Sequence, residues 1–214
     1  MDDLLRLMKT RRSIRRYEEE DVSDELLEKL IEAARWSPSG DNGQPWRFII
    51  VRDPETKKAL AKIAAEGSGR RFTAEYLTGR MQERFEGLKD PDKREKAFRK
   101  LTSGEVSAFL ANAPVIIVVC AKLDVWDVLI DSAMATQNML LMAHSLGLGS
   151  CVVVAPVSDM RDDIKVMKLL KIPPGYKVAA PVAIGYPQER PNPRPRLSLE
   201  EIIFYEEFNR RRTK

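Results

Sequence analysis

Arginine side chains gather near both ends of this chain, and they are the residues best suited to bind an anion. One group lies in RRSIRR, residues 11–16, and the other in RPNPRPR, residues 190–196. Almost no acidic residue interrupts either group, and a helix boundary or a run of prolines holds each backbone stiff or bent. Guanidinium groups on rigid segments suit a phosphate monoester, because their planar forks donate paired hydrogen bonds. Two solvated basic segments are the alternative interpretation.

A second unusual stretch is SPSGDNGQPW, residues 37–46. An ordinary surface turn needs one or two of Pro, Gly, Asn and Asp, but this stretch carries several of them, together with Gln and Trp. A simple connection between a helix and a strand remains possible. The composition nevertheless raises the question of what lies against a loop with so much exposed backbone and amide chemistry.

The sequence lacks the motifs that mark several common binding sites. No GxGxxG follows an expected strand and no P-loop is present, which argues against a Rossmann site and a nucleotide-phosphate loop. We predict no metal site, because the chain has one histidine and no cluster with ligand spacing. That histidine, His144, lies in an apolar helical context and is interpreted as a satisfied core residue rather than a catalytic base.

Four motifs together resemble the FMN-dependent nitroreductase family, which includes the iodotyrosine deiodinase-like proteins. They are RRSIRRY, EAARWSPSGDNGQPWRFIIV, LGLGSC and GYPQERPNPRPRLSLEEI, and they occur in the family's order. The first two are specific, and the last two are weaker alone. The resemblance covers most of the chain except residues 67–112, where no functional pattern is matched.

The resemblance implies an α+β fold, with a mixed, mostly antiparallel sheet flanked by helices. It also implies an intertwined homodimer with a long central helix and two FMN sites at the subunit interface. The whole chain, 1–214, would form one domain, in which 67–112 is a helical insertion that acts as a lid or shapes the substrate pocket. Phe72, Tyr76 and Phe85 could close over the flavin, although helix packing explains them as well.

Residues that match the family's motifs are expected to hold FMN. The phosphate and ribityl chain would contact Arg11, Arg12 and Ser13, with a clamp completed by Arg194 and Arg196. Arg15 would lie near the pyrimidine edge of the flavin. The flavin edge would also meet Ala155, Pro156 and Val157, with a backbone N–H near N5. The other subunit would contribute Pro38, Ser39, Gly40, Asn42 and Gln44. The loop at 37–46 would then form one wall of the site for the flavin ring, which is flat and carries amide groups at its edge.

The expected activity is electron transfer from NADH or NADPH through FMN to a nitroaromatic, a quinone or a similar small acceptor. No side-chain acid–base pair is needed, because the flavin carries the electron chemistry, and no catalytic side chain is predicted. The alternatives are a reductive dehalogenase of the iodotyrosine deiodinase type, a flavin-fragmenting relative and a non-catalytic flavin-binding or sensory protein. A dehalogenase would need a clamp for an amino-acid zwitterion, which the sequence does not reveal securely.

The elements that must position these residues alternate between helix and strand along the chain. Helical spacing predicts helices over 2–9, 23–36, 54–67, 126–147, 158–171 and 197–208. Apolar runs predict strands over 46–53, 114–121, 150–157 and 177–187, with 114–121 central in a sheet. Ser23 and Ser158 are expected N-caps, and Gly147 is an expected helix stop.

The overall composition is that of a globular chain. The net charge of +4 over 214 residues is small, so nucleic acid is not an expected partner. Cys120 and Cys151 lie in apolar runs and are expected to be core thiols in a reducing compartment. Charged and amide residues interrupt the longest apolar stretch, so no membrane span is expected. We therefore expect a cytoplasmic protein.

Overall fold

A four-stranded antiparallel sheet forms the centre of the computed structural model, which describes residues 3–211. Its strands lie in the order β1, β2, β4, β3, namely Trp46–Val51, Val115–Lys122, Tyr176–Gly185 and Gly149–Val152. Every neighbouring pair is antiparallel, and the central strand β2 is buried from Val115 to Ala121. The predicted class, a mostly antiparallel sheet flanked by helices, is confirmed.

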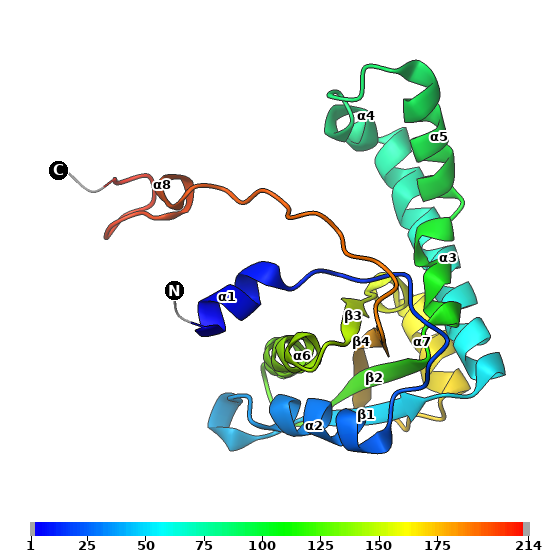
Figure 1. Ribbon diagram of the computed structural model, residues 1–214, viewed down its shortest axis with the longest axis vertical. Helices are drawn as coiled ribbons and strands as arrows, with labels where there is room; N and C mark the ends of the chain where they lie inside the picture. The colour runs from blue at the N-terminus through cyan, green and yellow to red at the C-terminus, as the bar shows by residue number, and fades with distance from the viewer. Residues whose placement is uncertain (1–2, 212–214) are drawn as a thin grey trace.

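Helices cover both faces of the sheet (Figure 1). On one face lie α2 (Asp24–Arg35) and α6 (Val128–Ser145), whose apolar side chains pack on Val115, Ile117 and Val119. On the other face α3 (Pro54–Leu77), the 3-10 helix η2 (Glu105–Asn112) and α7 (Met160–Leu169) pack on Ile116, Val118 and Cys120. Successive side chains of a strand point to opposite faces, so the continuous apolar run of β2 supplies both cores.

Helix ends follow the expected capping rules with one exception. The side chain of Ser23 accepts a hydrogen bond from the Leu26 N–H at the start of α2. Gly147, just after α6, has a φ of 78°, as a helix stop requires. The predicted N-cap Ser158 is wrong, because Asp159 caps α7 by accepting from Arg161 N. Ser158 instead donates its hydroxyl proton to the Val154 carbonyl, 2.8 Å away.

The third helix is longer than predicted. We expected an end at Gly67, but α3 continues through two glycines to Leu77. A Cβ atom at Gly67 would lie 2.5 Å from the Ala155 carbonyl oxygen, so this glycine allows close packing rather than ending the helix. The chain then returns through α4 (Arg80–Arg84) and α5 (Pro91–Thr102) to η2. We call residues 67–104 the hairpin, which projects from the body in Figure 1.

Aromatic rings hold the far end of the hairpin together. Phe98 on α5 lies edge-on to Tyr76 at 5.5 Å between ring centroids and edge-on to Phe85 at 5.6 Å. Edge-to-face contacts of this kind stabilise a small hydrophobic cluster. Tyr76 and Phe85 therefore have a packing role within the hairpin, whereas Phe72 lies nearer its base.

Two predicted elements near the C-terminal half are shorter than expected. The strand predicted over 150–157 ends at Val152, and residues 155–157 form the 3-10 helix η3. The helix predicted over 197–208 is reduced to α8, Leu199–Ile202, which begins with a capping box between Ser198 and Glu201. Residues 186–211 form an arm that extends away from the body (Figure 1). With few contacts to the body, the arm has no surface on which to propagate a helix.

Both cysteines are buried and unpaired, as predicted. Burial raises the pKa of Cys120 to about 12, with a smaller contribution from Asp163. No helix within residues 3–211 has the length and hydropathy needed to cross a membrane. The remaining helix, α1 (Asp3–Thr10), leads directly into the first arginine group.

Candidate functional site

The two arginine groups, distant in sequence, begin side by side in the fold. The segment after α1 forms one isolated bridge between Ser13 and Ser150 of β3, and another between Tyr17 and Pro187. Gln188 N–H donates to the Arg16 carbonyl at 3.0 Å, which continues this pairing into the arm. Residues 11–17 are therefore held like a short strand between the sheet edge and the start of the arm.

Glu189 fastens this junction with its carboxylate. Its Oε1 accepts from the Arg15 N–H at 2.7 Å, and its Oε2 accepts from Arg16 Nε at 3.2 Å. Burial alone would raise the pKa of Glu189. The hydrogen bonds from Arg15 and Arg16, together with the charge of Arg16, outweigh that effect and hold its pKa below the usual value. The ionised carboxylate therefore fixes the backbone at Arg15.

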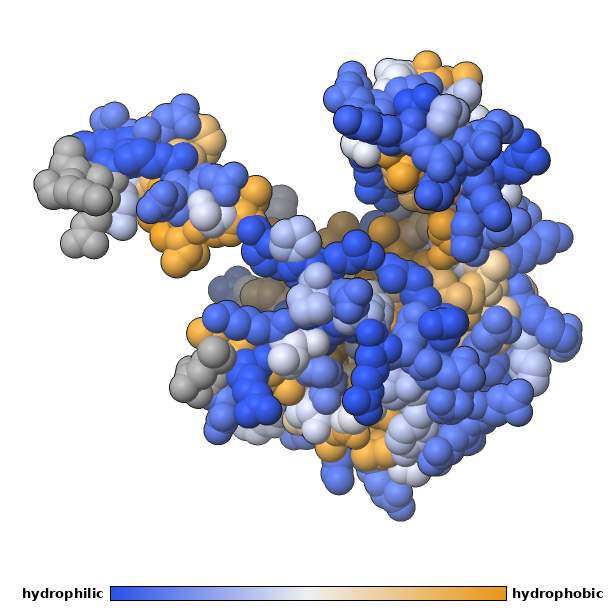
Figure 2. Space-filling view, turned by 45° about the horizontal axis from the view of Figure 1, so that its top comes forward, coloured by the Kyte–Doolittle hydropathy of each residue, from blue (hydrophilic) through white to orange (hydrophobic). Residues whose placement is uncertain are grey.

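A first pocket, which we call the hairpin pocket, opens between the hairpin and the sheet edge. It has a volume of about 490 Å³ and is lined by Arg15, Ser68, Arg71, Phe72, Lys100, Glu105, Val106, Ser107, Phe109 and residues 151–155. Figure 2 shows a hollow between the hairpin and the arm, with hydrophilic walls and a hydrophobic floor. An apolar floor with a few polar groups at its edge is typical of a site for a flat organic ligand.

A second pocket, the arginine pocket, lies on the other side of the 11–17 segment. Its volume is about 310 Å³, and its lining includes Arg11, Arg12, His144, Ser150 and Arg190. Arg12 Nε is buried without a hydrogen-bond partner, although Arg12 Nη1 donates to the Lys9 and Arg11 carbonyls. An unpaired buried donor is costly, so an anion in this pocket would supply the missing acceptor.

Burial and neighbouring cations also act on the other groups of the arginine pocket. Burial lowers the pKa of Arg11; Cys151 opposes this effect, and the charges of Arg12 and then Arg196 add to it. Burial also lowers the pKa of His144, followed by the charges of Arg11 and Arg12. His144 is only partly buried, and its Nε2 lies 2.9 Å from Thr10 Oγ1. The predicted position of His144 in the core is therefore wrong, since its ring is partly exposed and borders the arginine pocket.

The loop at residues 37–46 has a strained backbone. Asp41, Asn42 and Gln44 all have positive φ, at 50°, 54° and 44°. Such angles are uncommon outside glycine and accumulate at functional sites. The Gln44 N–H donates to Ser39 Oγ at 3.0 Å, which holds the loop closed.

The same loop lines neither pocket of its own chain. Within residues 3–211, Pro38, Ser39, Gly40, Asn42 and Gln44 are absent from the linings of both the hairpin pocket and the arginine pocket. An added Cβ at Gly40 would meet no atom within 4 Å, so nothing in this chain requires a glycine there. Both observations fit a loop that contacts another subunit's site, as the resemblance implies.

The predicted flavin-edge residues, Ala155, Pro156 and Val157, form η3 at the base of the hairpin. Ala155 lines the hairpin pocket, and its carbonyl packs against Gly67 of α3. Pro156 is buried, and Val157 N–H donates to the Val154 carbonyl at 3.0 Å. Ala155 is thus the one of these three residues that the structure places in the pocket with Arg15.

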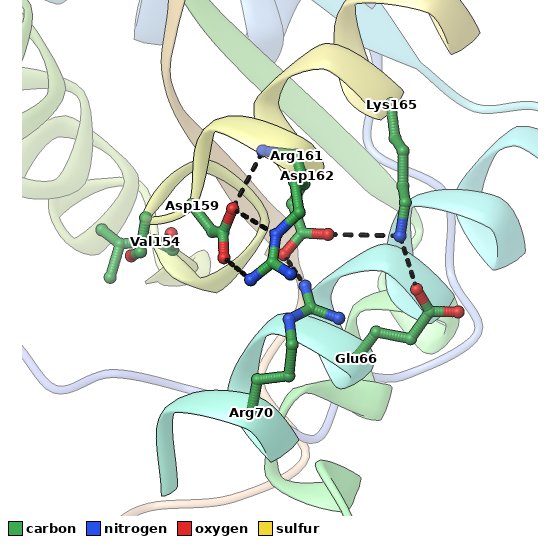
Figure 3. A network of polar contacts seen from close by, with 8 residues as sticks. Glu66, Arg70, Val154, Asp159, Arg161, Asp162 and Lys165 are labelled. Carbon is green, nitrogen blue, oxygen red and sulfur yellow. Dashed lines mark hydrogen bonds and ion pairs between the residues drawn. The ribbon is translucent and has the colours of Figure 1, made fainter. Parts of the chain in front are cut away.

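A network of charged side chains fixes η3 and α7 to α3 (Figure 3). Asp162, fully buried, pairs with Arg70 of α3 and with Lys165, whose Nζ lies 3.3 Å from Asp162 Oδ1. Lys165 also pairs with Glu66 at 2.8 Å, and this interaction lowers the pKa of Glu66. The network ties the base of the hairpin to the wall that carries Ala155.

The arm holds Arg194 and Arg196 outside both pocket linings of this chain. Both are exposed, and Arg196 Nη1 donates to the Pro195 carbonyl at 3.1 Å. The structure therefore brings Arg11, Arg12 and Ser13 together, whereas the predicted clamp with Arg194 and Arg196 is not closed within one chain.

Sequence reasoning missed several residues of these sites. It did not single out Glu189, or the pocket residues Ser68, Arg71, Lys100, Ser107 and Phe109. Glu189 had a usable signal, since it is the one acid directly before a basic, proline-rich run. The pocket residues had none, because they come from three separate elements, α3, α5 and η2, whose arrangement is set only by tertiary packing.

Comparison with known proteins supports the resemblance. The model of the Nitroreductase family matches residues 8–186. An NADH dehydrogenase of Thermus thermophilus is 30% identical over 213 residues, which cover 91% of this chain and 92% of that protein. The predicted family is therefore confirmed.

Two solved structures are similar over nearly their whole length. An FMN-dependent nitroreductase from Clostridium difficile R20291 shares 27% identity with a TM-score of 0.70, covering 94% of this chain and 98% of that one. A crystal structure of oxidized iodotyrosine deiodinase, bound to FMN and 3-iodo-L-tyrosine, shares 27% identity with a TM-score of 0.78. It covers 96% of this chain and 100% of the other.

Proposed function

This chain belongs to the Nitroreductase family, and from that premise we propose that it is an FMN-dependent oxidoreductase. It takes electrons from NADH or NADPH and passes them to a small acceptor such as a nitroaromatic or a quinone. One observation carries the proposal: the 11–17 segment runs between two pockets, with Arg11 and Arg12 lining one and Arg15 lining the other. FMN has the matching form, with a phosphate at one end and a flat ring at the other.

The chemistry of the arginine pocket suits the phosphate. Three guanidinium groups line it, those of Arg11, Arg12 and Arg190, against the one carboxylate of Glu189. The Nε of Arg12 is buried and unpaired, and Ser13 bridges to Ser150 at the pocket wall. Hydrogen bonds between guanidinium and phosphate are charge-assisted, and each contributes about 1.5–3 kcal/mol. Arg11 and Arg12 would therefore bind and orient the phosphate end of the cofactor.

The chemistry of the hairpin pocket suits the ring. Bound FMN supplies the two-electron chemistry, accepting a hydride from the nicotinamide and delivering electrons to the acceptor. Arg15 would place a permanent positive charge at the pyrimidine edge, where the reduced ring is anionic. Ala155 would offer its backbone N–H from η3. Because arginine does not titrate near neutral pH, this stabilisation should persist across the physiological range.

We also propose that the working unit is a homodimer. The loop at 37–46 has a strained backbone, yet within residues 3–211 it lines neither the hairpin pocket nor the arginine pocket of its own chain. A second copy would bring Ser39, Gly40 and Gln44 against the ring, and would give the arm with Arg194 and Arg196 a surface to cover. Gly40 is open to such an approach.

The direct test is an absorption spectrum of the purified protein under argon. The expected result is a flavin band that bleaches when NADH or NADPH is added and returns when a quinone is added. Colourless protein that ignores added FMN would overturn the proposal. Flavin that stays oxidised with both donors would show that nicotinamide is not the reductant.

A second test addresses the phosphate site. We expect Arg11→Ala and Arg196→Ala each to weaken FMN retention while the fold survives, as measured by flavin content and circular dichroism. Arg99→Ala on α5, an exposed residue paired with Glu95, is the matched control and should leave FMN content unchanged. If Arg11, Arg194 and Arg196 can all be replaced without loss of FMN affinity, the phosphate site lies elsewhere.

A reductive dehalogenase is the second candidate. It is favoured by the TM-score of 0.78 to iodotyrosine deiodinase and by the lining of the hairpin pocket, where the acid Glu105 occurs together with three cations. Quenching of flavin fluorescence by 3-iodotyrosine at micromolar concentration, absent with tyrosine, would favour this candidate over the first.

A further inference from the structure

We infer that the acceptor pocket of this protein selects aromatic acceptors that carry a negative charge, such as an aromatic carboxylate. The inference rests on the proposed function, because the acceptor must reach the flavin ring that the proposed function places in the hairpin pocket. The residues that carry it are Arg71 on α3 and Lys100 on α5, the two long helices of the hairpin. Both residues line the pocket.

The balance of charge in the hairpin pocket is positive. Three cations, Arg15, Arg71 and Lys100, line it against one carboxylate, Glu105. Arg15 is assigned to the pyrimidine edge of the flavin, so Arg71 and Lys100 remain for the acceptor. A pocket whose wall carries one sign of charge favours ligands of the opposite sign and disfavours ligands of the same sign.

Neither of the two cations is fully neutralised by its neighbours. Arg71 Nε donates to Glu75 Oε1 at 3.0 Å, but Arg84 Nη1 donates to Oε2 of the same carboxylate at 3.0 Å. Two guanidinium groups thus share one carboxylate. Within residues 3–211 Lys100 forms no ion pair, and the nearby Glu95 is paired with Arg99 instead. The wall therefore keeps an excess of positive charge that an incoming anion can use.

Aromatic rings lie beside these charges. The Arg71 guanidinium carbon lies 5.6 Å from the centroid of the Phe72 ring, and that of Arg15 lies 5.8 Å from the Phe109 ring. Both rings line the pocket. A planar acceptor could pack against Phe72 while its carboxylate reaches Arg71 and Lys100, which would hold an aromatic anion better than an aliphatic one.

The hydroxyl pair of Ser68 and Ser107 is the buried polar part of the pocket lining. Both side chains line the pocket, both are buried, and their hydroxyl groups bond to each other. A neutral hydroxyl pair stabilises a carboxylate less than a guanidinium or an ammonium group does. The charged end of the acceptor is therefore expected at Arg71 and Lys100.

A nitro group gives a balanced reaction for the test. NADPH supplies a hydride and solvent supplies a proton, and together they convert the nitro group into a nitroso group and one water. The two electrons lost by NADPH are gained by the acceptor, and its carboxylate takes no part in the reaction. The carboxylate can thus report binding without altering the stoichiometry.

The experiment compares two acceptors of similar shape, 4-nitrobenzoate and the neutral 4-nitrobenzamide. Protein whose flavin has been reduced in advance is mixed with each acceptor in a stopped-flow instrument, so that binding of the nicotinamide does not enter. The quantity compared is the ratio of the two second-order rate constants, in the native protein and in Arg71→Gln/Lys100→Gln. Intrinsic differences in reactivity between the acceptors cancel in this comparison.

We expect the double variant to lower the benzoate-to-benzamide ratio by roughly fivefold or more, mainly through the benzoate rate. The control is Lys96→Gln/Arg99→Gln, which removes the same charge from α5 at two positions that do not line the pocket. It should leave the ratio within twofold. An equal fall in control and test variants would mean that only the long-range field matters and would overturn the inference.

Two further outcomes separate this inference from the proposed function. If the benzamide is reduced normally but the ratio is the same in the native protein and the double variant, the inference fails and the proposed function stands. If neither acceptor oxidises the reduced flavin, the proposed function itself fails. A rate with 4-nitro-L-phenylalanine well above that with 4-nitrobenzoate would show that the wall selects a zwitterion, with Glu105 as partner, and would also overturn the inference.

Discussion

Glu189 is a single side chain that couples the two ends of the chain. Its carboxylate holds the Arg15 backbone and the Arg16 guanidinium at the point where the arm leaves the body. Arg15 lines the hairpin pocket, so its position depends on a residue that itself touches neither the proposed ring nor the acceptor. Glu189 is thus a positioning residue for the charge at the pyrimidine edge.

We expect Glu189→Gln to weaken FMN binding by roughly five- to tenfold, because the amide cannot replace the charge-assisted bonds to Arg15 and Arg16. The flavin absorption maximum should also shift, since Arg15 would no longer be fixed against the ring. Titration of apoprotein with FMN measures both effects. Glu20→Gln, an exposed acid of the same N-terminal region, is the control. Unchanged affinity and spectrum in Glu189→Gln would show that the junction has no effect on the site.

His144 predicts a dependence of stability on pH. Its pKa in the fold is below the usual value of 6.5, because burial and then Arg11 and Arg12 disfavour the charged ring. The unfolded chain therefore binds the proton more readily, so the stability due to neutral His144 is full above pH 6.5 and is lost as the pH falls through that value. The effect should be small, because the ring is partly exposed.

We expect the native protein to lose more thermal stability between pH 8 and pH 5.5 than His144→Gln does. Scanning calorimetry of both proteins at the two pH values measures the difference. An identical loss in both would assign the pH dependence to other groups.

At the scale of single residues, the sequence predicted the arginines and the loop residues but not the side chains that they contact. Arg11, Arg12 and Arg15 could be found because arginines repeat over a short stretch that also matches a family motif. Arg71 and Lys100 could not, because they meet only where α3 and α5 pack together. Glu189 had a signal as the acid before a basic run, but its bonds to Arg15 and Arg16 span a long distance in sequence. Such contacts are set by the way elements pack rather than by local spacing.

Among the elements, the crossing of α3 with α7 controls the wall of the hairpin pocket. Gly67 allows α3 to touch the Ala155 carbonyl, and Asp162 pairs with Arg70 on the other side of the contact. Small residues that allow close approach, combined with a buried ion pair, give such a crossing one preferred geometry. The hairpin therefore starts from a fixed base.

We expect Asp162→Asn to destabilise the protein by about 2–4 kcal/mol, because Arg70 and Lys165 would lose their shared carboxylate at a buried position. Urea unfolding followed by circular dichroism measures the change. Asp127→Asn, before α6 and without a side-chain cap bond, is the control and should change stability by less than about 0.5 kcal/mol. Equal, small effects in the two variants would show that the network contributes little.

The elements predicted best were those with a strong local pattern. The helices over 23–36 and 126–147 and the central strand over 114–121 agree closely with α2, α6 and β2. The errors arise where tertiary contacts override local signals. Gly67 resembles a helix end but lies inside α3, and the apolar residues after Val152 resemble a strand but turn into η3. The C-terminal helix shortens because the arm has nothing to pack against in one chain.

At the scale of the whole molecule, large apolar side chains remain exposed near the start of α6 and on the arm. Trp126 and Ile130 lie exposed at and near the start of α6, while Leu199 and Phe208 lie exposed on the arm. Large apolar patches on a single chain mark association sites. Together with the loop at 37–46, they support the proposed homodimer.

We expect Ile130→Asp to shift the protein from dimer to monomer and to release FMN, because a charge would be buried at the subunit contact. Light scattering after gel filtration measures the mass, and absorbance measures the flavin. Leu77→Asp, at an even more exposed position at the end of α3, is the control and should remain dimeric. A dimeric Ile130→Asp protein with full FMN would place the subunit contact elsewhere.

The three positive φ angles in the loop at 37–46 have a cost for the free protein. Gln44 has no special tolerance for its φ of 44°, so holding it there subtracts about 1–2 kcal/mol from the stability of the fold. A glycine at position 44 would relieve that penalty. If the loop walls the flavin ring as proposed, the protein would then survive heating better but turn over more slowly, because the loop would gain stability and lose its rigidity.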